Sequence, residues 1–394
     1  MTALAGVKVL DLSRLLPGPF ASMVLGDLGA QVDKIEDAGP GDYMRHMPPQ
    51  LDAVESGLES DGKKASSQSA MFLSLNRNKR SATLDLKKPA ARDALLKMVA
   101  RYDVLLEQFR PGVLDRLGLS HAKLLETNPR LVICALTGYG QDGPLAHRAG
   151  HDINYLARAG LLGFQGPANG APQPPGFQLA DIGGALWSVI GILAALAERE
   201  KTGNGKVVDI AMLDASMGFA AASFGMLAAG VHPKAGDEAL TGGLAIYGTY
   251  ATKDGRAMSL GALEPKFWNA FAAVVGHPAD MSDFLVGPHQ VALKEKLRAI
   301  FLAKTQAEWI ELAMTGDYCL EPVLAPNELE NDPQIAARGL FFDLPSRWGS
   351  LLQTRTPVTP KGAKHAEPPL QGEHTRAILE EAGLSEEEIA KLTG

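Results

Sequence analysis

The sequence predicts an α/β fold in which a large doubly wound domain is joined to a smaller α+β domain. Three observations near the N-terminus support this prediction. VKVLDL (7–12) and QVDKIE (31–36) read as buried strands, and residues 19–30 between them read as a short helix with prolines at its start. A second helix pattern at 89–102 leads into another strand pattern at 103–109. Because such βαβ repeats imply parallel strands, we expect one parallel sheet covered by helices.

The length and the changes in composition predict two domains within the 394 residues. Residues 1–227 read as the first part of the large domain, 228–340 as a small α+β domain, and 341–394 as a return linker and the C-terminal part of the large domain. Residues 48–70 are polar and serine-rich, so we expect an exposed loop or an insertion there, which either shapes a pocket mouth or is disordered.

The charge and the cysteine content exclude several classes of function. A net charge of −7 without a run of Lys and Arg argues against a general nucleic-acid binder. Cys134 and Cys319 lie far apart with no metal-like spacing, so we expect no disulfide framework and no metal site. The N-terminus lacks the pattern of a signal peptide, which makes the cytoplasm the expected location. We expect no nucleic-acid or membrane partner.

The first βαβ unit lacks the signature of a nicotinamide or flavin enzyme. Glu36 ends the second strand, where a dinucleotide fold carries its ribose-binding acid. The first strand, however, is followed by SRLLPGPF and not by the glycine pattern GxGxxG. A dinucleotide-dependent enzyme is therefore disfavoured.

The stretch from Gly138 to Lys206 holds the candidate chemistry. Residues 182–197 are uncharged, which predicts a helix buried on most sides and too short to span a bilayer. Asp181 precedes them at an expected N-cap position, where it either simply caps the helix or serves a ligand that approaches over Gly183 and Gly184. His151 lies near the end of an element, and it is either a surface residue or an acid–base group.

The sequence resembles the class III CoA-transferase family (CaiB/BaiF type). Within this family it resembles the α-methylacyl-CoA racemases most. The resemblance rests on an ordered set of motifs that runs nearly from end to end. The motifs are VLDLSRLLPGPF, NRNKRSATLDLK, FRPGVLDRLGL, GYGQDGP, AGHDINYLARAG, TGNGKVVDIAM and GEHTRAILEEAGLSEEEI. It implies a Rossmann-like large domain and an interlocked homodimer.

The resemblance implies three catalytic residues. In the transferases an aspartate at the position of Asp181 is the nucleophile that forms an acyl anhydride and then a thioester with CoA. In the racemases the same carboxylate acts as a base beside the histidine of GHDINY, here His151. Glu264, in GALEPKF, is implied to support that histidine, although it could instead only cap the helix that begins at Pro265. Leu16, where the formyl-CoA transferase type tends to carry Gln, and the presence of His151 both favour the racemase.

The family also implies a binding site for the CoA part of an acyl-CoA substrate, with no permanently bound cofactor. The implied contacts are Leu84, Lys87, Phe109, Arg110 and Arg116, with Tyr155 near the pantetheine. Asp152 either binds the pantetheine arm or caps its own helix, and Lys79 and Arg80 either add charge to the site or are solvated. Several family members carry Arg where this sequence has Asp37, so we consider Lys34 or Arg45 as substitutes.

Three functions follow as hypotheses. The first is the epimerisation of a 2-methylacyl-CoA thioester by proton removal and return through an enolate, which calls for two acid–base groups. The second is CoA transfer between carboxylic acids through Asp181. The third is a non-catalytic acyl-CoA-binding protein.

Overall fold

The computed structural model describes residues 2–54 and 67–393, and these fall into two compact units. The first unit comprises Met1–Ala159, Phe177–Phe219 and Pro333–Gly394. The second unit comprises Gly160–Gly176 and Ala220–Asp332. The small domain was predicted at 228–340; the second unit begins and ends somewhat earlier and also includes the connector 160–176.

The first unit is built on a six-stranded sheet with the order β5-β2-β1-β6-β7-β8. Every neighbouring pair is parallel, and Val9 of β1, for example, pairs with Val32 of β2 and Val104 of β6. The strands are β1 (Lys8–Asp11), β2 (Gln31–Glu36), β5 (Lys79–Thr83), β6 (Val104–Glu107), β7 (Val132–Thr137) and β8 (Lys206–Ala211). This is the strand order of a doubly wound fold, as the sequence predicted.

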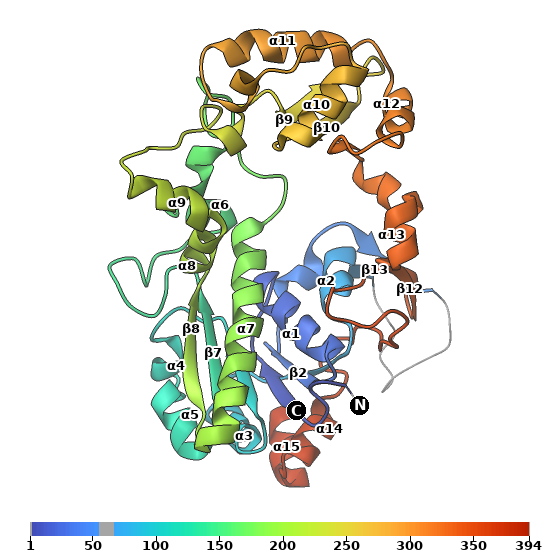
Figure 1. Ribbon diagram of the computed structural model, residues 1–394. Helices are drawn as coiled ribbons and strands as arrows, with labels where there is room; N and C mark the ends of the chain where they lie inside the picture. The colour runs from blue at the N-terminus through green and yellow to red at the C-terminus, as the bar shows by residue number, and fades with distance from the viewer. Residues whose placement is uncertain (1, 55–66, 394) are drawn as a thin grey trace. The chain divides into compact units, whose positions relative to one another are not determined.

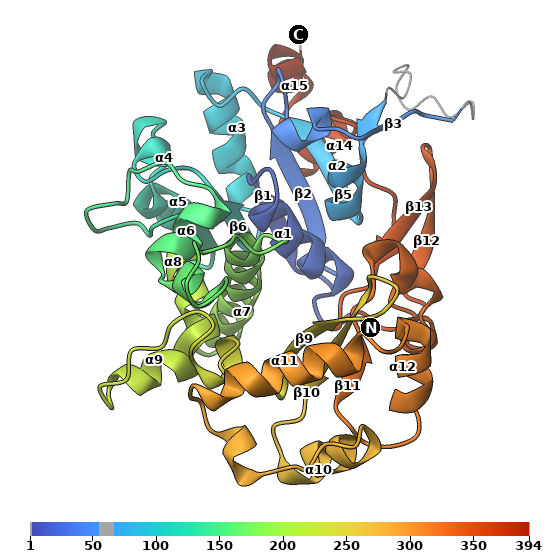
Figure 2. The ribbon, with the colours of Figure 1, turned by 90° about the horizontal axis from the view of Figure 1, so that it is seen from above.

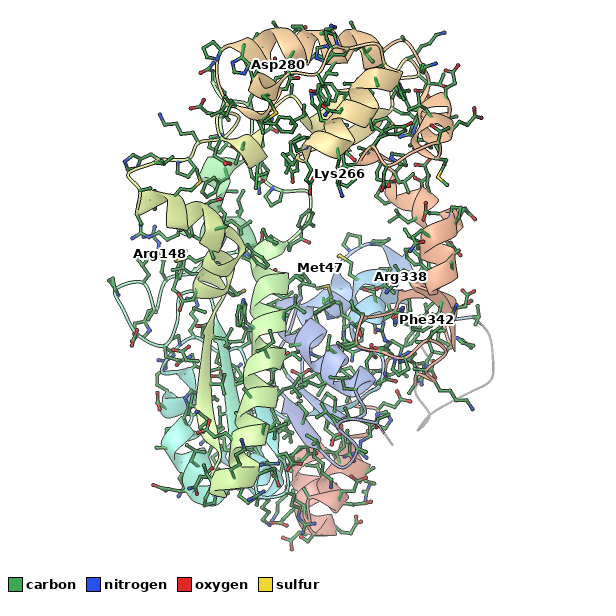
Figure 3. The ribbon with its side chains drawn as sticks, viewed as in Figure 1. Met47, Arg148, Lys266, Asp280, Arg338 and Phe342 are labelled. Carbon is green, nitrogen blue, oxygen red and sulfur yellow. The ribbon has the colours of Figure 1, made fainter. Side chains whose placement is uncertain are left out.

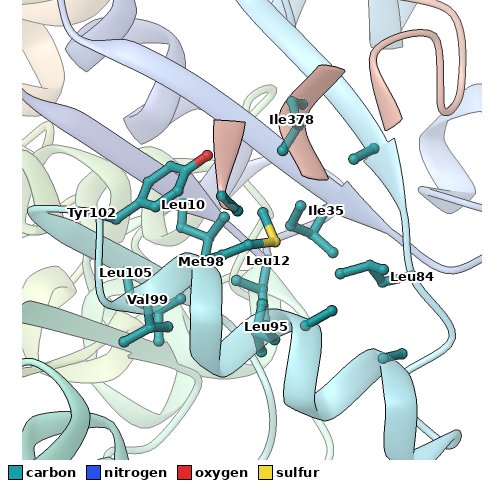
Figure 4. Packing of buried hydrophobic residues seen from close by; sticks show 14 of the residues in the cluster. Leu10, Leu12, Ile35, Leu84, Leu95, Met98, Val99, Tyr102, Leu105 and Ile378 are labelled. Atoms are coloured by element: carbon teal, nitrogen blue, oxygen red, sulfur yellow. The ribbon is translucent and has the colours of Figure 1, made fainter. Parts of the chain in front are cut away.

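Helices cover both faces of this sheet (Figures 1 and 2). One face carries α1 (Pro17–Asp27) and α7 (Leu179–Thr202), which pack against each other. The opposite face carries α3 (Pro89–Val99), α5 (His121–Thr127), α14 (Thr375–Glu381) and α15 (Glu386–Thr393). Figure 4 shows the core on this second face, where Leu95 and Met98 of α3 pack on Leu10 of β1 and Leu105 of β6. A sheet covered on both faces explains why all six residues of β7 are buried.

Helix α7 differs from the expected helix buried on most sides. Its buried face includes Ser188 and Ile192, but Leu186, Trp187 and Ile190 are 42%, 45% and 52% exposed. The helix is also longer than predicted, with 24 residues. Among the helices of the described residues, it is the one that is long and apolar enough to cross a bilayer, judged by length and composition. Half of its apolar window is buried inside the protein, as in a helix that packs on a sheet.

The remaining elements of the first unit are short. They are β3 (Gln50–Leu51), β4 (Gln68–Ser69), α2 (Ala70–Leu75), α4 (Val113–Arg116), α6 (Asp152–Arg158), α8 (Met212–Met217), α13 (Pro333–Arg338), β12 (Phe341–Ser346) and β13 (Gly349–Thr354). The ends of the polar stretch 48–70 pair as the antiparallel strands β3 and β4, while residues 55–66 lie outside the described residues. Phe342 of the hairpin β12–β13, labelled in Figure 3, packs against a cluster around Phe72 and Trp348.

The second unit is a small α+β structure around the antiparallel sheet β11-β10-β9. Its elements are α9 (Ala221–Leu227), β9 (Tyr247–Ala251), β10 (Ala257–Gly261), α10 (Pro265–Val274), α11 (His289–Phe301), α12 (Gln306–Ala313) and β11 (Leu320–Pro322). A turn at Lys253–Gly255 joins β9 to β10, with Gly255 at a φ of +75°. Aromatic rings fill its core: Phe301 stacks on Tyr250 at 4.8 Å and packs against Trp309 at 4.7 Å between centroids.

Candidate active site

The N-terminal ends of α6 and α7 meet in the first unit, and Asp152 joins them. Asp152 is the first residue of α6, and its Oδ1 accepts hydrogen bonds from the N–H groups of Ala180 (2.7 Å) and Asp181 (3.1 Å). The carboxylate therefore caps α7, a different helix from the one that the sequence analysis considered. This contact fixes the segment His151–Asp152 against the first turn of α7.

Asp181 is the third residue of α7, and the expectation that it is the N-cap is wrong. Gln178 occupies the N-cap position, and the N–H of Asp181 is itself bonded to Asp152. The carboxylate of Asp181 consequently has no capping role. Its partial burial, and then the negative charge of Asp152, raise the pKa of Asp181 to about 7. A carboxyl group that titrates near neutrality is suited to accept and return protons.

Gly183 and Gly184 serve helix packing and not the approach of a ligand. A Cβ on Gly183 would lie 2.7 Å from the ring of Phe219, and one on Gly184 would lie 2.7 Å from Cγ of Met212. Both glycines are buried inside α7, where they let α8 come close. The expectation that they leave open space beside Asp181 is therefore wrong.

His151 precedes α6 as its N-cap residue and is exposed. Its N–H donates a hydrogen bond of 3.0 Å to Oδ1 of Asn154, which fixes the backbone at the start of the helix. The loop that leads to it contains Arg148, labelled in Figure 3. His151 is the sequence neighbour of Asp152, and Asp152 holds the backbone of Asp181, so both candidate residues lie at the junction of α6 and α7.

Tyr155 packs below this junction. It is buried, its hydroxyl donates to the carbonyl of Gly150 (2.6 Å), and its ring meets Tyr139 edge-on at 5.1 Å. Burial and then the neighbouring Tyr139 and Asp181 raise its pKa to about 12. In this structure the hydroxyl holds the loop before His151.

Glu264 belongs to the second unit. It is the N-cap residue of α10, but its side chain makes no capping hydrogen bond. It is exposed, and Lys266 two residues further on is labelled in Figure 3. Glu264 therefore occupies the N-cap position with its backbone, but its side chain does not cap the helix as the sequence suggested it could.

A cavity of about 270 Å³ lies at the carboxyl ends of β1, β2, β5 and β6. The chain leaves β1 and β6 in opposite directions along the sheet, so this is the switch point where doubly wound folds bind ligands. Of the predicted CoA contacts, Leu84, Lys87 and Phe109 line the cavity. Its walls are mostly apolar, with Lys87 exposed at the rim. An apolar slot with a cation beside it suits a purine ring that carries phosphates.

The two cations considered as substitutes at Asp37 are both committed to internal ion pairs. Nζ of Lys34 is fully buried, 2.9 Å from Asp42 and 2.6 Å from the carbonyl of Ser13. Arg45 is buried and bonds both carboxylate oxygens of Glu36, at 2.7 and 2.6 Å. Neither can reach a phosphate without breaking a buried pair, so both suggestions are wrong. Glu36 lines the cavity with its carboxylate already bonded.

Lys79 and Arg80 also hold the protein together. Lys79 is buried 3.5 Å from Asp11, and burial lowers its pKa to about 7. Arg80 forms ion pairs of 2.7 Å with both Asp33 and Glu381. Lys79 is therefore neither solvated nor available to a ligand, which corrects that expectation, whereas the side chain of Arg80 is 25% exposed but already paired with two carboxylates.

Two further predicted CoA contacts are exposed arginines. Arg110 is exposed and lines a small neighbouring cavity, and Arg116 is exposed on α4. Arg14, which was not among the predicted site residues, also lines the larger cavity and lies over the ring of Tyr43 at 4.7 Å. Its position directly after the first strand was the available signal, because ligands bind beyond the carboxyl ends of such strands. Among the described residues, no group of three or more His, Cys, Asp and Glu side chains is placed to hold a metal ion.

The family is established by comparison with known proteins. A model of CoA-transferase family III matches residues 4–375, so the chain belongs to this family and is an enzyme of it. The sequence is similar to the alpha-methylacyl-CoA racemase of Mus musculus, with 36% identity over 397 residues, 99% of this chain and 96% of the racemase.

Transferases and solved structures of the family are similar as well. The succinate–glutarate CoA-transferase of Agrobacterium fabrum is 32% identical over 389 residues, 96% of this chain and 95% of the transferase. The crystal structure of a CAIB/BAIF family protein from Brucella suis matches with a TM-score of 0.81 at 32% identity, covering 97% of this chain and 99% of that one. The prediction of the family and of its fold is confirmed.

Proposed function

We propose that the protein is an α-methylacyl-CoA racemase-like enzyme that epimerises 2-methylacyl-CoA thioesters. The observation that carries the proposal is the junction of α6 and α7, where Asp181, whose carboxyl group has a pKa of about 7, donates its backbone N–H to Asp152, the sequence neighbour of His151. The similarity to racemases over nearly the whole chain supports it.

Epimerisation needs one group that removes the α-proton and another that returns a proton to the opposite face. In our proposal His151 and Asp181 are these two groups. Removal of the proton by one of them leaves a planar enolate, and the protonated form of the other delivers a proton to its far side. Each positioned group contributes roughly 10²–10⁴-fold. Near neutral pH the carboxyl group of Asp181, with a pKa of about 7, can exist in either protonation state, which is what a reversible reaction requires.

Glu264 is proposed to orient the imidazole of His151. This role is the one that the family resemblance implies, and the carboxylate of Glu264 is free for it in so far as it makes no capping hydrogen bond to α10. Asp152 is proposed to act through Asp181, by holding its backbone and raising its pKa. Tyr155 is proposed to lie near the pantetheine arm, with its hydroxyl holding the loop that carries His151.

The CoA end of the substrate is proposed to occupy the cavity at the switch point. Leu84 and Phe109 then contact the adenine, and Lys87, Arg110 and Arg116 contact the phosphates. In this reading CoA is part of the substrate, and no permanently bound cofactor takes part.

Replacing Lys87 by alanine is expected to raise the KM for the acyl-CoA roughly tenfold and to leave kcat unchanged. The reason is that a charge-assisted bond to a phosphate contributes about 1.4 kcal/mol far from the reacting carbon. Steady-state kinetics measure both constants. Lys88→Ala is the matched control, because Lys88 is the exposed neighbour that does not line the cavity. Equal KM values for the two variants would contradict the placement of the phosphates.

The second candidate is a class III CoA transferase in which Asp181 is the nucleophile. The similarity to transferases at 32% identity favours it. In that reaction the carboxylate attacks the thioester carbonyl and releases CoA, and the CoA thiolate then attacks the aspartyl carbonyl of the anhydride, which releases the donor acid and gives an aspartyl thioester. An acceptor carboxylate attacks this thioester to form a second anhydride, and the released CoA thiolate attacks the acceptor carbonyl, which gives the new acyl-CoA and frees Asp181. A non-catalytic acyl-CoA binder is the third hypothesis.

An isotope experiment separates the candidates. A single epimer of a 2-methylacyl-CoA incubated in D₂O is expected to gain deuterium at the α-carbon and to lose optical purity without a second acid. A transferase would instead require a free carboxylate as acceptor, and hydroxylamine would trap its acyl-enzyme. A binder would show neither reaction.

The assembly and the location form part of the same proposal. We propose a homodimer, which the exposed apolar side chains Leu186, Trp187 and Ile190 of α7 support. The interlocked arrangement of the two chains remains a prediction from the family resemblance. A cytoplasmic location agrees with the unpaired state of Cys134 and Cys319.

A further inference from the structure

A second, smaller cavity of about 40 Å³ lies beside the proposed CoA pocket. It is enclosed by the end of β6, the loop that follows it and the start of α5, and its walls include Glu107, Arg110, His121 and Gln141. Nε2 of Gln141 is buried here without a hydrogen-bond partner. Phe109 borders both cavities, so the short segment Phe109–Arg110 separates the two.

Glu107 ties three elements together at this point. It ends β6 and is only 2% exposed. Its Oε2 accepts a hydrogen bond of 2.8 Å from the N–H of Phe109, and its Oε1 lies 3.1 Å from Nε2 of His121, the first residue of α5. The strand, the loop and the helix therefore share one buried carboxylate.

The charge of this carboxylate has one compensating partner among the ion pairs of the described residues, and that partner is His121. Arg110 is a second cation on the wall of the same cavity. A neutral His121 would leave Glu107 uncompensated, and the carboxylate would then attract the guanidinium of Arg110. In the proposed function that guanidinium contacts a CoA phosphate.

We propose that Glu107 and His121 form a positioning pair that holds the Phe109–Arg110 segment in place and leaves Arg110 available to the CoA phosphates. The inference rests on the proposed CoA site. It adds that the affinity for CoA depends on whether His121 is charged. Glu107 and His121 are positioning residues, because they act on the substrate through Phe109 and Arg110.

A dependence on pH follows from the surroundings of His121. The hydrogen bond that His121 donates to Glu107 raises the pKa of His121, burial opposes this rise, and the charges of Glu107, Asp115 and Asp209 raise the pKa further. Because the pKa is raised in the folded protein, the charged pair is fully present below the ordinary value of 6.5 and is lost as the pH rises through the folded-state value. CoA affinity is expected to fall over the same range.

The test is the affinity of the full-length protein for free CoA, measured by isothermal titration calorimetry from pH 6 to pH 9. His121→Gln keeps a donor at the position of Nε2 and removes the charge. It is expected to bind CoA about tenfold more weakly than the wild type at low pH, and equally at high pH. Comparing the two proteins at each pH cancels the titration of the CoA phosphates. His289→Gln is the control, because His289 is an exposed first residue of α11 in the second unit.

A second variant shows whether the uncompensated charge of Glu107 causes the loss of CoA affinity. In the double variant Glu107→Gln, His121→Gln the buried charge is gone, so Arg110 is released and the lost affinity is expected to return. A purely structural role of His121 would give no such rescue, and a His121→Gln protein with the pH profile of the wild type would overturn the inference. If the wild type failed to bind CoA at all, the proposed function would fail instead.

Discussion

Replacing Asp181 by asparagine is expected to lower kcat for epimerisation by roughly 10²–10⁴-fold while CoA still binds. The amide has almost the same shape as the carboxyl group but cannot accept or return a proton, so one of the two acid–base groups is lost. The bond from the Asp181 N–H to Asp152 involves only the backbone and survives the change. Loss of α-deuteration in D₂O, with the affinity for CoA measured separately, checks the prediction.

The same variant is expected to be more stable than the wild type at neutral pH. The pKa of Asp181 is raised from 3.8 to about 7 in the folded protein, so the native state favours the protonated form. Its contribution to the free energy of unfolding therefore falls as the pH rises from about 4 to about 7, by up to about 4 kcal/mol. Asparagine removes this penalty, and the gain in stability is expected to be complete above pH 7 and absent below about pH 4.

Asp214→Asn is the matched control for both measurements. Asp214 is the third residue of α8, as Asp181 is of α7, but its side chain is exposed. We expect wild-type activity and little change in the denaturation midpoint. An Asp181→Asn protein that kept its activity would contradict both the racemase and the transferase, because both need this carboxyl group.

The sheet was predictable because each of these strands can be recognised from its own segment of sequence. QVDKIE begins and ends as β2 does, and the alternation of apolar strands with helices gave the parallel order. The exposed face of α7 was not predictable, because Leu186, Trp187 and Ile190 are as apolar as the residues that face the sheet. Composition indicates what a helix can bury, whereas the packing of the neighbouring elements decides which side is covered.

The site was predictable in its residues and not in their environments. His151 and Asp181 were identified from motifs, yet the bond from the backbone of Asp181 to Asp152 joins residues 29 positions apart in sequence. The cations show the same limit, because Lys34 and Lys79 resemble surface lysines until the sheet places them beside Asp42 and Asp11. Charge in a sequence does not reveal whether its partner is a ligand or another side chain of the protein.

Replacing His151 by alanine is expected to abolish epimerisation and to leave the affinity for CoA unchanged. His151 is exposed at the start of α6, so its removal leaves no cavity in the core, and the cap on α7 is provided by Asp152 and not by the imidazole. The proton on one face of the α-carbon would then have no acceptor, and roughly 10²–10⁴-fold of the rate would be lost. Polarimetry of a single epimer and calorimetry with free CoA measure the two effects independently.

The outcome also distinguishes the two reactions, because a transferase needs only the carboxylate of Asp181. His147→Ala is the matched control, since His147 is an exposed histidine of the same loop, four residues earlier. If His151→Ala still racemised at the rate of His147→Ala, the two-base scheme would be wrong. If neither protein racemised but both moved CoA to a free acid, the transferase would be the function, with His151 as a surface residue.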